Sequence, residues 1–222
     1  MSHVPDDLAG PEDPDDGAQG RGRGTRARIL AATAASLSER GYAATTLGCI
    51  ARVAGINPPG LYHYFSSREE LIAEVIGTGQ RVVLDHVTDE LRRAGPAADA
   101  MDRIATAVEA HLRVELELSD FARAVTRNAG QVPDVVASAA HDGSEAYHHL
   151  WRELLDAAAE SGQVGDDLDL GVARMLVVGA LNWTTEWWGS AATDDMETLM
   201  RTARSFVCHG LAGGQETGVT RV

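Results

Sequence analysis

Tyr62 and His63 are adjacent side chains of types that bind other molecules. A phenol hydroxyl and an imidazole are hydrogen-bonding groups of the right size for phosphate oxygens and base edges. Leu61 and Phe65 lie four residues apart, so on a helix they share one face, which we expect to be buried. This arrangement would direct Tyr62 and His63 toward solvent or a partner molecule.

Glu145 and His148 form a second candidate group, because Glu-x-x-His on a helix places both side chains on one face. A carboxylate-bridged di-iron site needs this motif twice, with two further Glu residues, and we find no second copy. The pair His148-His149 and the lone His111 have no histidine four residues away, which argues against a metal site. We therefore expect an exposed or structural Glu-His pair and no bound metal.

Enzyme motifs are also missing from the sequence. It has no nucleophile elbow, no Walker loop and no glycine fingerprint for a dinucleotide. We expect no catalytic residue, no cofactor and no enzyme activity. A helical metal-binding protein or enzyme that uses Glu145 and His148 is kept as an alternative.

The elements that must position Tyr62 and His63 are two short helices. Thr45 or Thr46 is suited to cap the first helix, and Gly55 is suited to end it. Asn57 is suited to cap the second helix, with Pro58 at its first position. Two short helices joined by a glycine turn form a helix-turn-helix.

The run from Thr25 to Ile76 resembles the N-terminal domain of TetR-type transcriptional regulators. The matching residues keep one order and one spacing over about fifty positions: Ile29, Leu30, Gly41, Tyr42, Thr45, Thr46, Ile50, Ala51, Ala54, Gly55, the run from Leu61 to Phe65, Glu70 and Leu71. The resemblance implies an all-α fold of about nine helices. A three-helix helix-turn-helix domain would be followed by a larger helical domain for ligand binding and dimerisation.

We expect four segments along the chain, the first from its composition and the two domains from the resemblance. Residues 1–24 are rich in Asp, Gly and Pro and should form a disordered acidic tail with a basic end. Residues 25–70 should form the DNA-binding domain, residues 71–212 the effector-binding and dimerisation domain, and residues 213–222 a loose tail. Strand patterns are missing from the sequence, which agrees with a helical protein.

Charge is unevenly distributed along the chain, whose formal net charge is −14. Residues 21–70 carry seven arginines against three acids, while residues 71–222 carry twelve arginines against twenty-four acids. The only basic block therefore coincides with the helix-turn-helix, as expected for a DNA-binding domain on an acidic body.

The candidate DNA contacts come from the residues and from the resemblance. Arg26 ends a basic stretch that would either reach a minor groove or be plain solvated charge. Arg68 matches a usually basic family position that contacts phosphate. The family usually has a polar or basic residue where this chain has Pro58, Pro59 and Gly60, so specificity should depend on few side chains and on DNA shape. The full set is Arg26, Thr45, Thr46, Asn57, Pro59, Gly60, Tyr62, His63 and Arg68.

The second domain should hold an apolar ligand cavity with a few polar groups. Several polar or aromatic residues interrupt an aliphatic pattern there, and Arg123 or Arg127 would suit a carboxylate or phosphate. The candidate effector contacts are His111, Arg123, Arg127, Tyr147, Trp151 and Trp183.

The helix expected to begin near Leu168 is apolar around most of its circumference, which requires cover on several sides. Its apolar residues include Val172, Met175, Leu176, Val178, Leu181, Trp183 and Trp187. We expect it to form a dimer interface with the last helix, while Trp183 could instead line the cavity. The run from Leu181 to Trp188 is similar to a family branch whose effectors are CoA thioesters of lipid or steroid breakdown.

The leading hypothesis is a homodimeric repressor that binds a near-palindromic double-stranded operator. A small, largely apolar effector, with a CoA thioester or a lipid or steroid catabolite as candidates, would release it. A DNA-binding protein that responds to no ligand is the other alternative. Cys49 and Cys208 fit no paired metal spacing, and no secretion signal or membrane-spanning run occurs, so we expect reduced thiols and a cytoplasmic protein.

Overall fold

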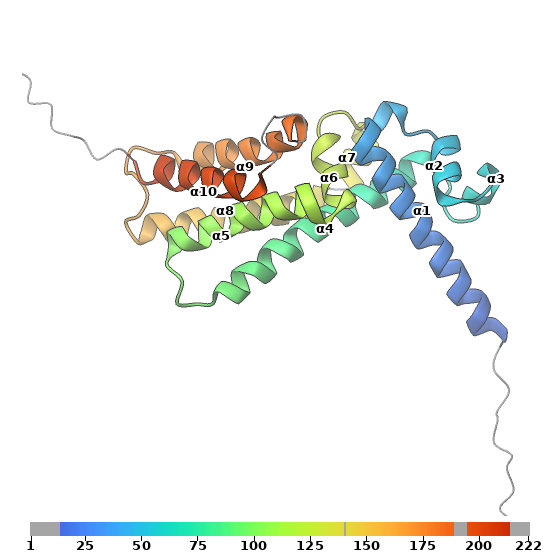
Figure 1. Cartoon of the computed structure of the whole chain (residues 1–222), viewed down its shortest axis with the longest axis horizontal. Helices are drawn as coiled ribbons and strands as arrows, with labels where there is room; N and C mark the ends of the chain where they lie inside the picture. The colour runs from blue at the N-terminus through green and yellow to red at the C-terminus, as the bar shows by residue number, and fades with distance from the viewer. Residues whose placement is uncertain (1–13, 140, 189–194, 214–222) are drawn as a thin grey trace, which may run out of the picture.

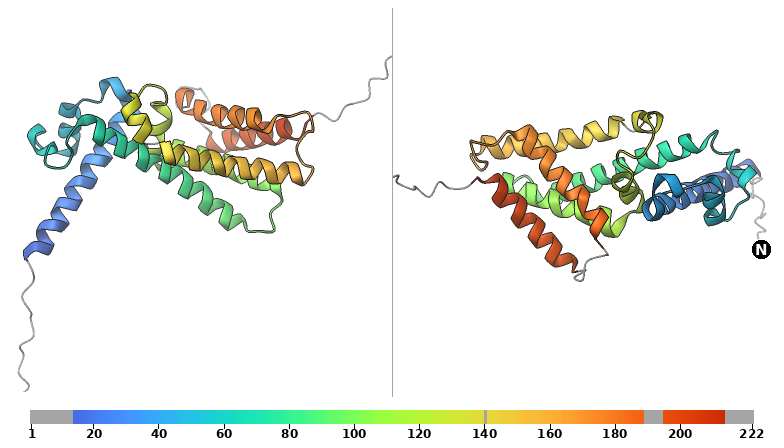
Figure 2. Two further views of the ribbon diagram at one scale, coloured as in Figure 1. Left: turned by 180° about the vertical axis from the view of Figure 1, so that it is seen from behind. Right: turned by 90° about the horizontal axis from the view of Figure 1, so that it is seen from above.

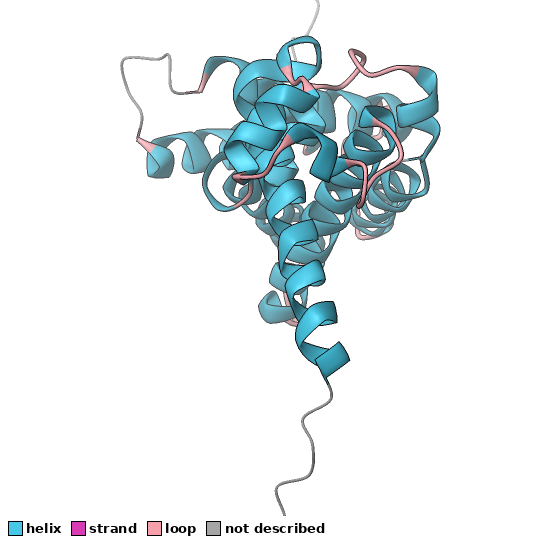
Figure 3. Ribbon diagram, turned by 90° about the vertical axis from the view of Figure 1, so that its right-hand side faces the viewer, coloured by secondary structure: helices cyan, strands magenta, loops and turns pink. Residues whose placement is uncertain are grey.

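The structure is a computed structural model that describes residues 14–139, 141–188 and 195–213, and its regular elements over those ranges are all helices (Figure 3). The all-α fold expected from the sequence is confirmed. In chain order the elements are α1 (Pro14–Ala44), α2 (Leu47–Ala54), α3 (Pro58–Leu61), α4 (Arg68–Ala94), α5 (Ala100–Arg113), the π-helical turn η1 (Val114–Leu118), α6 (Asp120–Arg127), α7 (Asp134–Ala139), α8 (His141–Glu160), α9 (Leu170–Trp187) and α10 (Met196–Leu211). None of these helices is long and apolar enough to cross a membrane.

Helix α4 connects the two ends of the elongated molecule (Figure 1). Its first turn supplies Leu71 to the core of α1, α2 and α3. Its next residues, including Ile72 and Val75, form a second cluster with Leu37 of α1 and Ala124 of α6. Further along, Val87 joins the large core of the second domain. One helix therefore takes part in all three apolar clusters.

Helix α1 begins farther upstream than Thr25, the residue at which the sequence predicts that the ordered chain begins. It begins at Pro14 and projects away from the rest of the molecule (Figure 1). Nothing lies within 4 Å of a Cβ placed on Gly22 or Gly24, so this part has no tertiary packing there. Extending an existing helix is easier than nucleating one, which accounts for the extra turns. Residues 1–13 and 214–222, parts of the two expected tails, lie outside the described residues.

The helix-turn-helix has the expected caps. The Thr46 side chain accepts a hydrogen bond from the Cys49 amide, and Gly55 ends α2 at a positive φ of 67°. The Asn57 side chain accepts a hydrogen bond from the Gly60 amide at 2.9 Å, with Pro58 at the first helical position. Helix α3 spans only four residues, and the chain continues through a turn to the buried Phe65.

Helices α4 and α6 pack against each other (Figure 2), and they come close together at Gly79. A Cβ on Gly79 would lie 2.1 Å from the Phe121 carbonyl oxygen and 2.6 Å from Cγ2 of Val125. No Cβ fits at such distances, so the separation of the two helices depends on a glycine at this position.

We expect Gly79→Ala to lower the free energy of unfolding by about 1–3 kcal/mol or more, because the methyl group forces α4 and α6 apart. Gly77→Ala, on the same helix, is the matched control. Its Cβ would meet only Nη1 of Arg81, at 3.7 Å. It should stabilise the helix by about 0.5–1 kcal/mol. Urea denaturation of both variants measures the difference, and equal effects would contradict the packing described here.

Candidate functional site

Helices α2 and α3 lie at one end of the molecule, opposite α9 and α10 (Figure 1). Five of the candidate DNA contacts are exposed at that end: Thr46, Asn57, Pro59, Tyr62 and His63. The side chain of Tyr62 is 60% exposed, whereas Leu61 and Phe65 are buried. The expected division between inward and outward faces is therefore found, and Gly60 lies half-buried beside them.

Three other candidates are engaged inside the domain. Arg26 makes two bonds of 2.5 Å to the Glu74 carboxylate on α4. Arg68 donates to the Thr45 carbonyl at 2.7 Å and to the Tyr42 carbonyl, and its guanidinium lies 4.1 Å from the centre of the Tyr42 ring. The Thr45 hydroxyl is buried and donates to the Gly41 carbonyl. These contacts hold α1 and α4 against the loop before α2.

Other arginines of the basic block extend outward. Arg23, Arg28, Arg40 and Arg52 are exposed on α1 and α2. They contribute to the charge of the basic block but are not among the DNA contacts expected from the sequence. Any of them that reaches a phosphate would add sequence-independent attraction to DNA.

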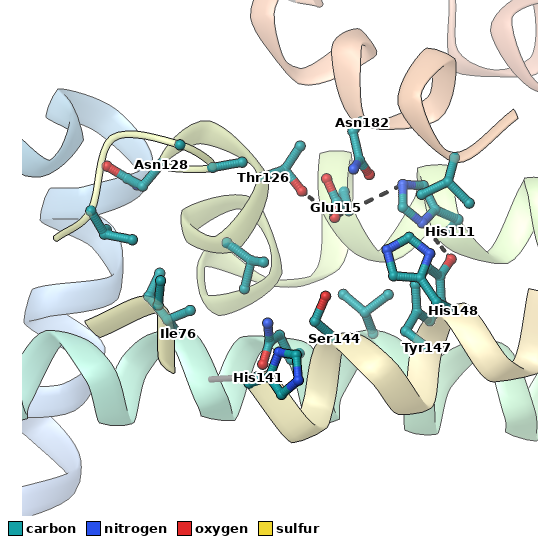
Figure 4. Close-up of a pocket in the computed structure, with 18 residues that line it drawn as sticks. Ile76, His111, Glu115, Thr126, Asn128, His141, Ser144, Tyr147, His148 and Asn182 are labelled. Atoms are coloured by element: carbon teal, nitrogen blue, oxygen red, sulfur yellow. Dashed lines mark hydrogen bonds and ion pairs between the residues drawn. The ribbon is translucent and has the colours of Figure 1, made fainter. Parts of the chain in front are cut away.

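A cavity of about 390 Å³ lies within the second domain (Figure 4). Its walls come from α4, η1, α6, α7, α8 and α9, together with the last turn of α5 and the loop after α6. The apolar part of the lining consists of residues such as Ile76, Val83, Val125 and Val178. The volume lies near the lower end of the range typical of small-molecule pockets, roughly 300–1,000 Å³.

A row of polar side chains crosses one wall of this cavity (Figure 4). The Tyr147 hydroxyl lies 2.7 Å from Nδ1 of His111. On the next turn, Glu115 Oε1 accepts a 2.5 Å hydrogen bond from the Thr126 hydroxyl. Nε2 of His111 lies 3.9 Å from Glu115 Oε1, which is too far for a hydrogen bond.

Burial keeps all three titratable groups of this row uncharged near pH 7. It lowers the pKa of His111 to about 4 and raises the pKa of Glu115 to about 8. The pKa of Tyr147 is also raised by burial, so this phenol keeps its proton. The contact between His111 and Glu115 is therefore one between neutral groups and not an ion pair.

The π-helical turn places Glu115 in the cavity wall. The Ser119 amide bonds the Val114 carbonyl five residues back, which interrupts the α-helical pattern at the end of α5. Arg123 of α6 donates to the carbonyls of Glu115 and Leu116 at 3.1 and 2.8 Å. Turns of this kind are frequent at functional sites.

The structure brings together some of the candidate effector contacts and separates others. His111 and Tyr147 line the cavity, and Trp151 packs edge-on behind Tyr147 with ring centres 6.4 Å apart. Arg123 binds backbone carbonyls, and neither it nor Arg127 lines the cavity. Trp183 is 65% exposed on α9, away from the pocket.

Several pocket residues were not singled out from the sequence as effector contacts. They are Gln80, Glu115, Thr126, Ser144 and His148. Glu115 had a detectable signal, because it follows His111 by four residues on the apolar face that includes Val108 and Leu112. A carboxylate in such a stripe must be neutral or paired when it is buried.

Glu145 and His148 do not form a joint site. Glu145 lies 3.2 Å from the exposed His141, whereas His148 turns into the cavity. Among the described residues, no group of three or more His, Cys, Asp or Glu side chains is arranged to hold a metal ion.

Comparison with known proteins identifies the family. Residues 29–75 match the model described as bacterial regulatory proteins, tetR family, and residues 97–211 match the model of the tetracyclin repressor-like C-terminal domain. This chain belongs to the TetR family. It is therefore a DNA-binding transcriptional regulator and not an enzyme.

Individual relatives cover most of the TetR-family chain. The transcriptional repressor KstR2 of Rhodococcus jostii is 28% identical over 85% of this chain and 92% of its own. The structure of the ketosteroid regulator KstR2 of Mycobacterium tuberculosis matches with a TM-score of 0.67 at 22% identity, over 85% of this chain and 95% of that one. AibR in complex with isovaleryl coenzyme A and operator DNA matches with a TM-score of 0.72 at 17% identity, over 82% and 97%.

The exposed position of Tyr62 and His63 predicts how their removal acts. Tyr62→Phe or His63→Ala should weaken DNA binding roughly tenfold or more, because a hydrogen bond to a charged phosphate is lost. The melting temperature should hardly change. A fluorescence-anisotropy titration with a duplex selected from random sequences measures affinity.

Arg68→Ala is the contrasting variant for this experiment. It removes bonds inside the domain, so we expect a lower melting temperature. Unchanged DNA affinity in the Tyr62 and His63 variants would exclude them as contacts.

Proposed function

We propose that this protein is a homodimeric repressor that leaves its operator when a small, largely apolar molecule enters the cavity of the second domain. The observation that carries this proposal is the continuity between the polar wall of that cavity and helix α1. Helix α6 supplies Thr126 to the wall and ends at Asn128, which also lines the cavity. A ligand at the wall therefore touches the helix that is bonded to the DNA-binding domain.

The bonds between α6 and α1 run at both ends of α6. Nδ2 of Asn128 donates to the Leu37 carbonyl at 3.2 Å, and the Ser38 hydroxyl donates to the Asp120 carboxylate at 3.2 Å. A ligand shifts the equilibrium only if it prefers one arrangement of these helices. We infer that ligand binding moves α6 and α1. The two DNA-binding domains of the dimer, its heads, then no longer fit the operator together. Couplings of this kind are about 1–3 kcal/mol, or roughly 5 to 150-fold in affinity.

Dimer formation is supported by the two-sided character of α9. Val177, Val178 and Leu181 are buried within the protomer, so the apolar residues of this helix divide into two sets. The second set is exposed at helical spacing along the other side: Val172, Met175, Leu176, Trp183 and Trp187. With the 74% exposed Phe206 of α10, it forms an apolar surface that a second copy would cover.

A charge on this surface should prevent dimerisation. We expect Leu176→Arg, at a side chain that is 69% exposed, to give folded monomers, because it would place an unpaired charge in the interface. Ala157→Arg adds the same charge to the exposed face of α8 and should stay dimeric. Sedimentation velocity distinguishes the two, and a dimeric Leu176→Arg protein would place the interface elsewhere.

Two heads of a symmetric dimer require a near-palindromic operator. Its half-sites should be about 34 to 36 Å apart, or a multiple of that distance, so that both heads enter the major groove. Footprinting of the selected duplex measures this spacing, and protection of one asymmetric half-site at full affinity would contradict it. We also propose that the protein binds its operator in the cytoplasm.

Effector release is tested with the protein bound to its selected duplex. Relatives named for steroid regulation and for a complex with a coenzyme A thioester make lipid and steroid acyl-CoA compounds the first candidates. We expect at least one of them, or its free acyl part, to weaken DNA binding by roughly 5 to 150-fold at saturation. If no such compound changes the affinity, the protein regulates without this class of ligand.

A further inference from the structure

We propose that the cavity receives an uncharged, oxygen-bearing end of the effector, such as a ketone on an alicyclic skeleton, and that Glu115 and His111 donate hydrogen bonds to that oxygen. This inference rests on the proposed function of the cavity as the effector site. It adds the chemistry of the group that is recognised.

Unsatisfied polar atoms are concentrated in this cavity. Five buried side-chain atoms without a hydrogen-bond partner belong to residues that line it: Gln80 Oε1, His111 Nε2, Glu115 Oε2, Asn128 Oδ1 and His148 Nδ1. His111 and Glu115 are only 1% and 2% exposed. A buried polar group without a partner destabilises the protein, so a ligand that supplies the missing bonds gains affinity from each of them.

We assign protons to these atoms from the neighbouring bonds. The Thr126 hydroxyl donates to Glu115 Oε1, so the acid proton of the neutral carboxyl belongs on Oε2. The protonated Tyr147 hydroxyl is placed to donate to Nδ1 of His111, which leaves the imidazole proton on Nε2. Both unpartnered atoms are then donors on adjacent turns of one wall. Two donors suit a single acceptor oxygen with two lone pairs.

The lining also excludes the charged alternatives. Among the described residues that form the lining there is neither Arg nor Lys, so an anionic group would meet no permanent positive charge. A cation would require ionised Glu115, which burial opposes. The rest of the lining combines aliphatic side chains such as Val83 and Val178 with uncharged polar ones such as Gln80 and Asn182. The volume of about 390 Å³ is small, so the nucleotide part of any thioester effector would lie outside.

The direct test is calorimetric titration of the full-length protein with three bicyclic probes of one shape. These are 2-decalone, decalin, and protonated 2-aminodecalin. We expect the ketone to bind roughly ten- to hundredfold more tightly than the hydrocarbon, because the hydrocarbon leaves both donors unpaired. The ammonium probe should bind more weakly than the ketone. Preference for the ammonium probe, or equal affinity for ketone and hydrocarbon, would overturn the proposal.

Substitution of Glu115 separates a neutral acid from a carboxylate. Glu115→Gln retains an oxygen for the Thr126 hydroxyl and an N–H donor in place of Oε2, so ketone affinity should stay within about threefold. Glu115→Leu should lose roughly tenfold or more. Glu117→Gln, the same substitution at an exposed neighbour that lies 3.7 Å from Arg113, is the control. If Glu115→Gln loses ketone binding while Glu117→Gln keeps it, an ionised carboxylate is needed at position 115, and the proposal is refuted.

The pH dependence gives an independent readout. Below a pKa of about 8 the Glu115 carboxyl keeps its proton, and above it the donor is lost. Ketone affinity should therefore fall roughly tenfold between pH 7 and pH 9. The other titratable or charged groups around Glu115 are His111 on α5, Arg123 on α6, and His141, Tyr147 and His148 on α8, while α4 and α9 contribute the neutral Gln80 and Asn182. Glu115→Gln should show no such fall, since these other groups are unchanged in it, and an equal fall would refute the assignment to Glu115.

Failure of this inference is distinguishable from failure of the proposed function. If no ketone binds but an acyl-CoA compound releases DNA, the effector site stands and its chemistry differs. If the ketone binds through Glu115 and no compound changes DNA affinity, the pocket chemistry stands and the regulatory function fails.

Discussion

The close packing of α4 against α6 is the contact on which the other parts of this protein depend. It is possible because Gly79 has no side chain where the backbone of α6 passes. Helix α4 belongs to both domains, and α6 touches α1 as well as the cavity. Because packed interiors deform little, the proposed displacement of α6 would be passed on to α1 and α4. The position of the DNA-binding head is thereby tied to the shape of the second domain.

The π-helical turn carries a carboxyl group that is buried beside an imidazole. The turn lies at the end of α5, and there Arg123 binds the carbonyls of Glu115 and Leu116. Thr126 satisfies one oxygen of the carboxyl. The arginine thus stabilises the backbone of the wall, while the neutral side chains remain available to a ligand. This division of roles explains why Arg123 lies close to the cavity although its side chain is not part of the lining.

Arginine has the same structural use in the DNA-binding domain. Arg26 and Arg68 belong to the basic block, yet their guanidinium groups bind Glu74 and two backbone carbonyls. They orient α1, α4 and the loop before α2, and so hold the exposed pair Tyr62 and His63 in place. The electrostatic attraction of the domain to DNA then comes from the exposed arginines of α1 and α2.

The sequence by itself determined the helical fold, the caps of α2 and α3, and the outward direction of Tyr62 and His63, because capping and helical spacing are local properties. It also singled out His111 and Tyr147, which line the cavity. Only the tertiary structure decided that Glu115, Thr126 and Asn182 meet, since they come from three separate elements brought together by packing. The tertiary structure likewise showed that Arg123 and Trp183 do not line the cavity. From sequence alone an arginine can bind a ligand or a backbone carbonyl, and an apolar side chain can line a pocket or face another surface. Only the distances in the folded chain distinguish these cases.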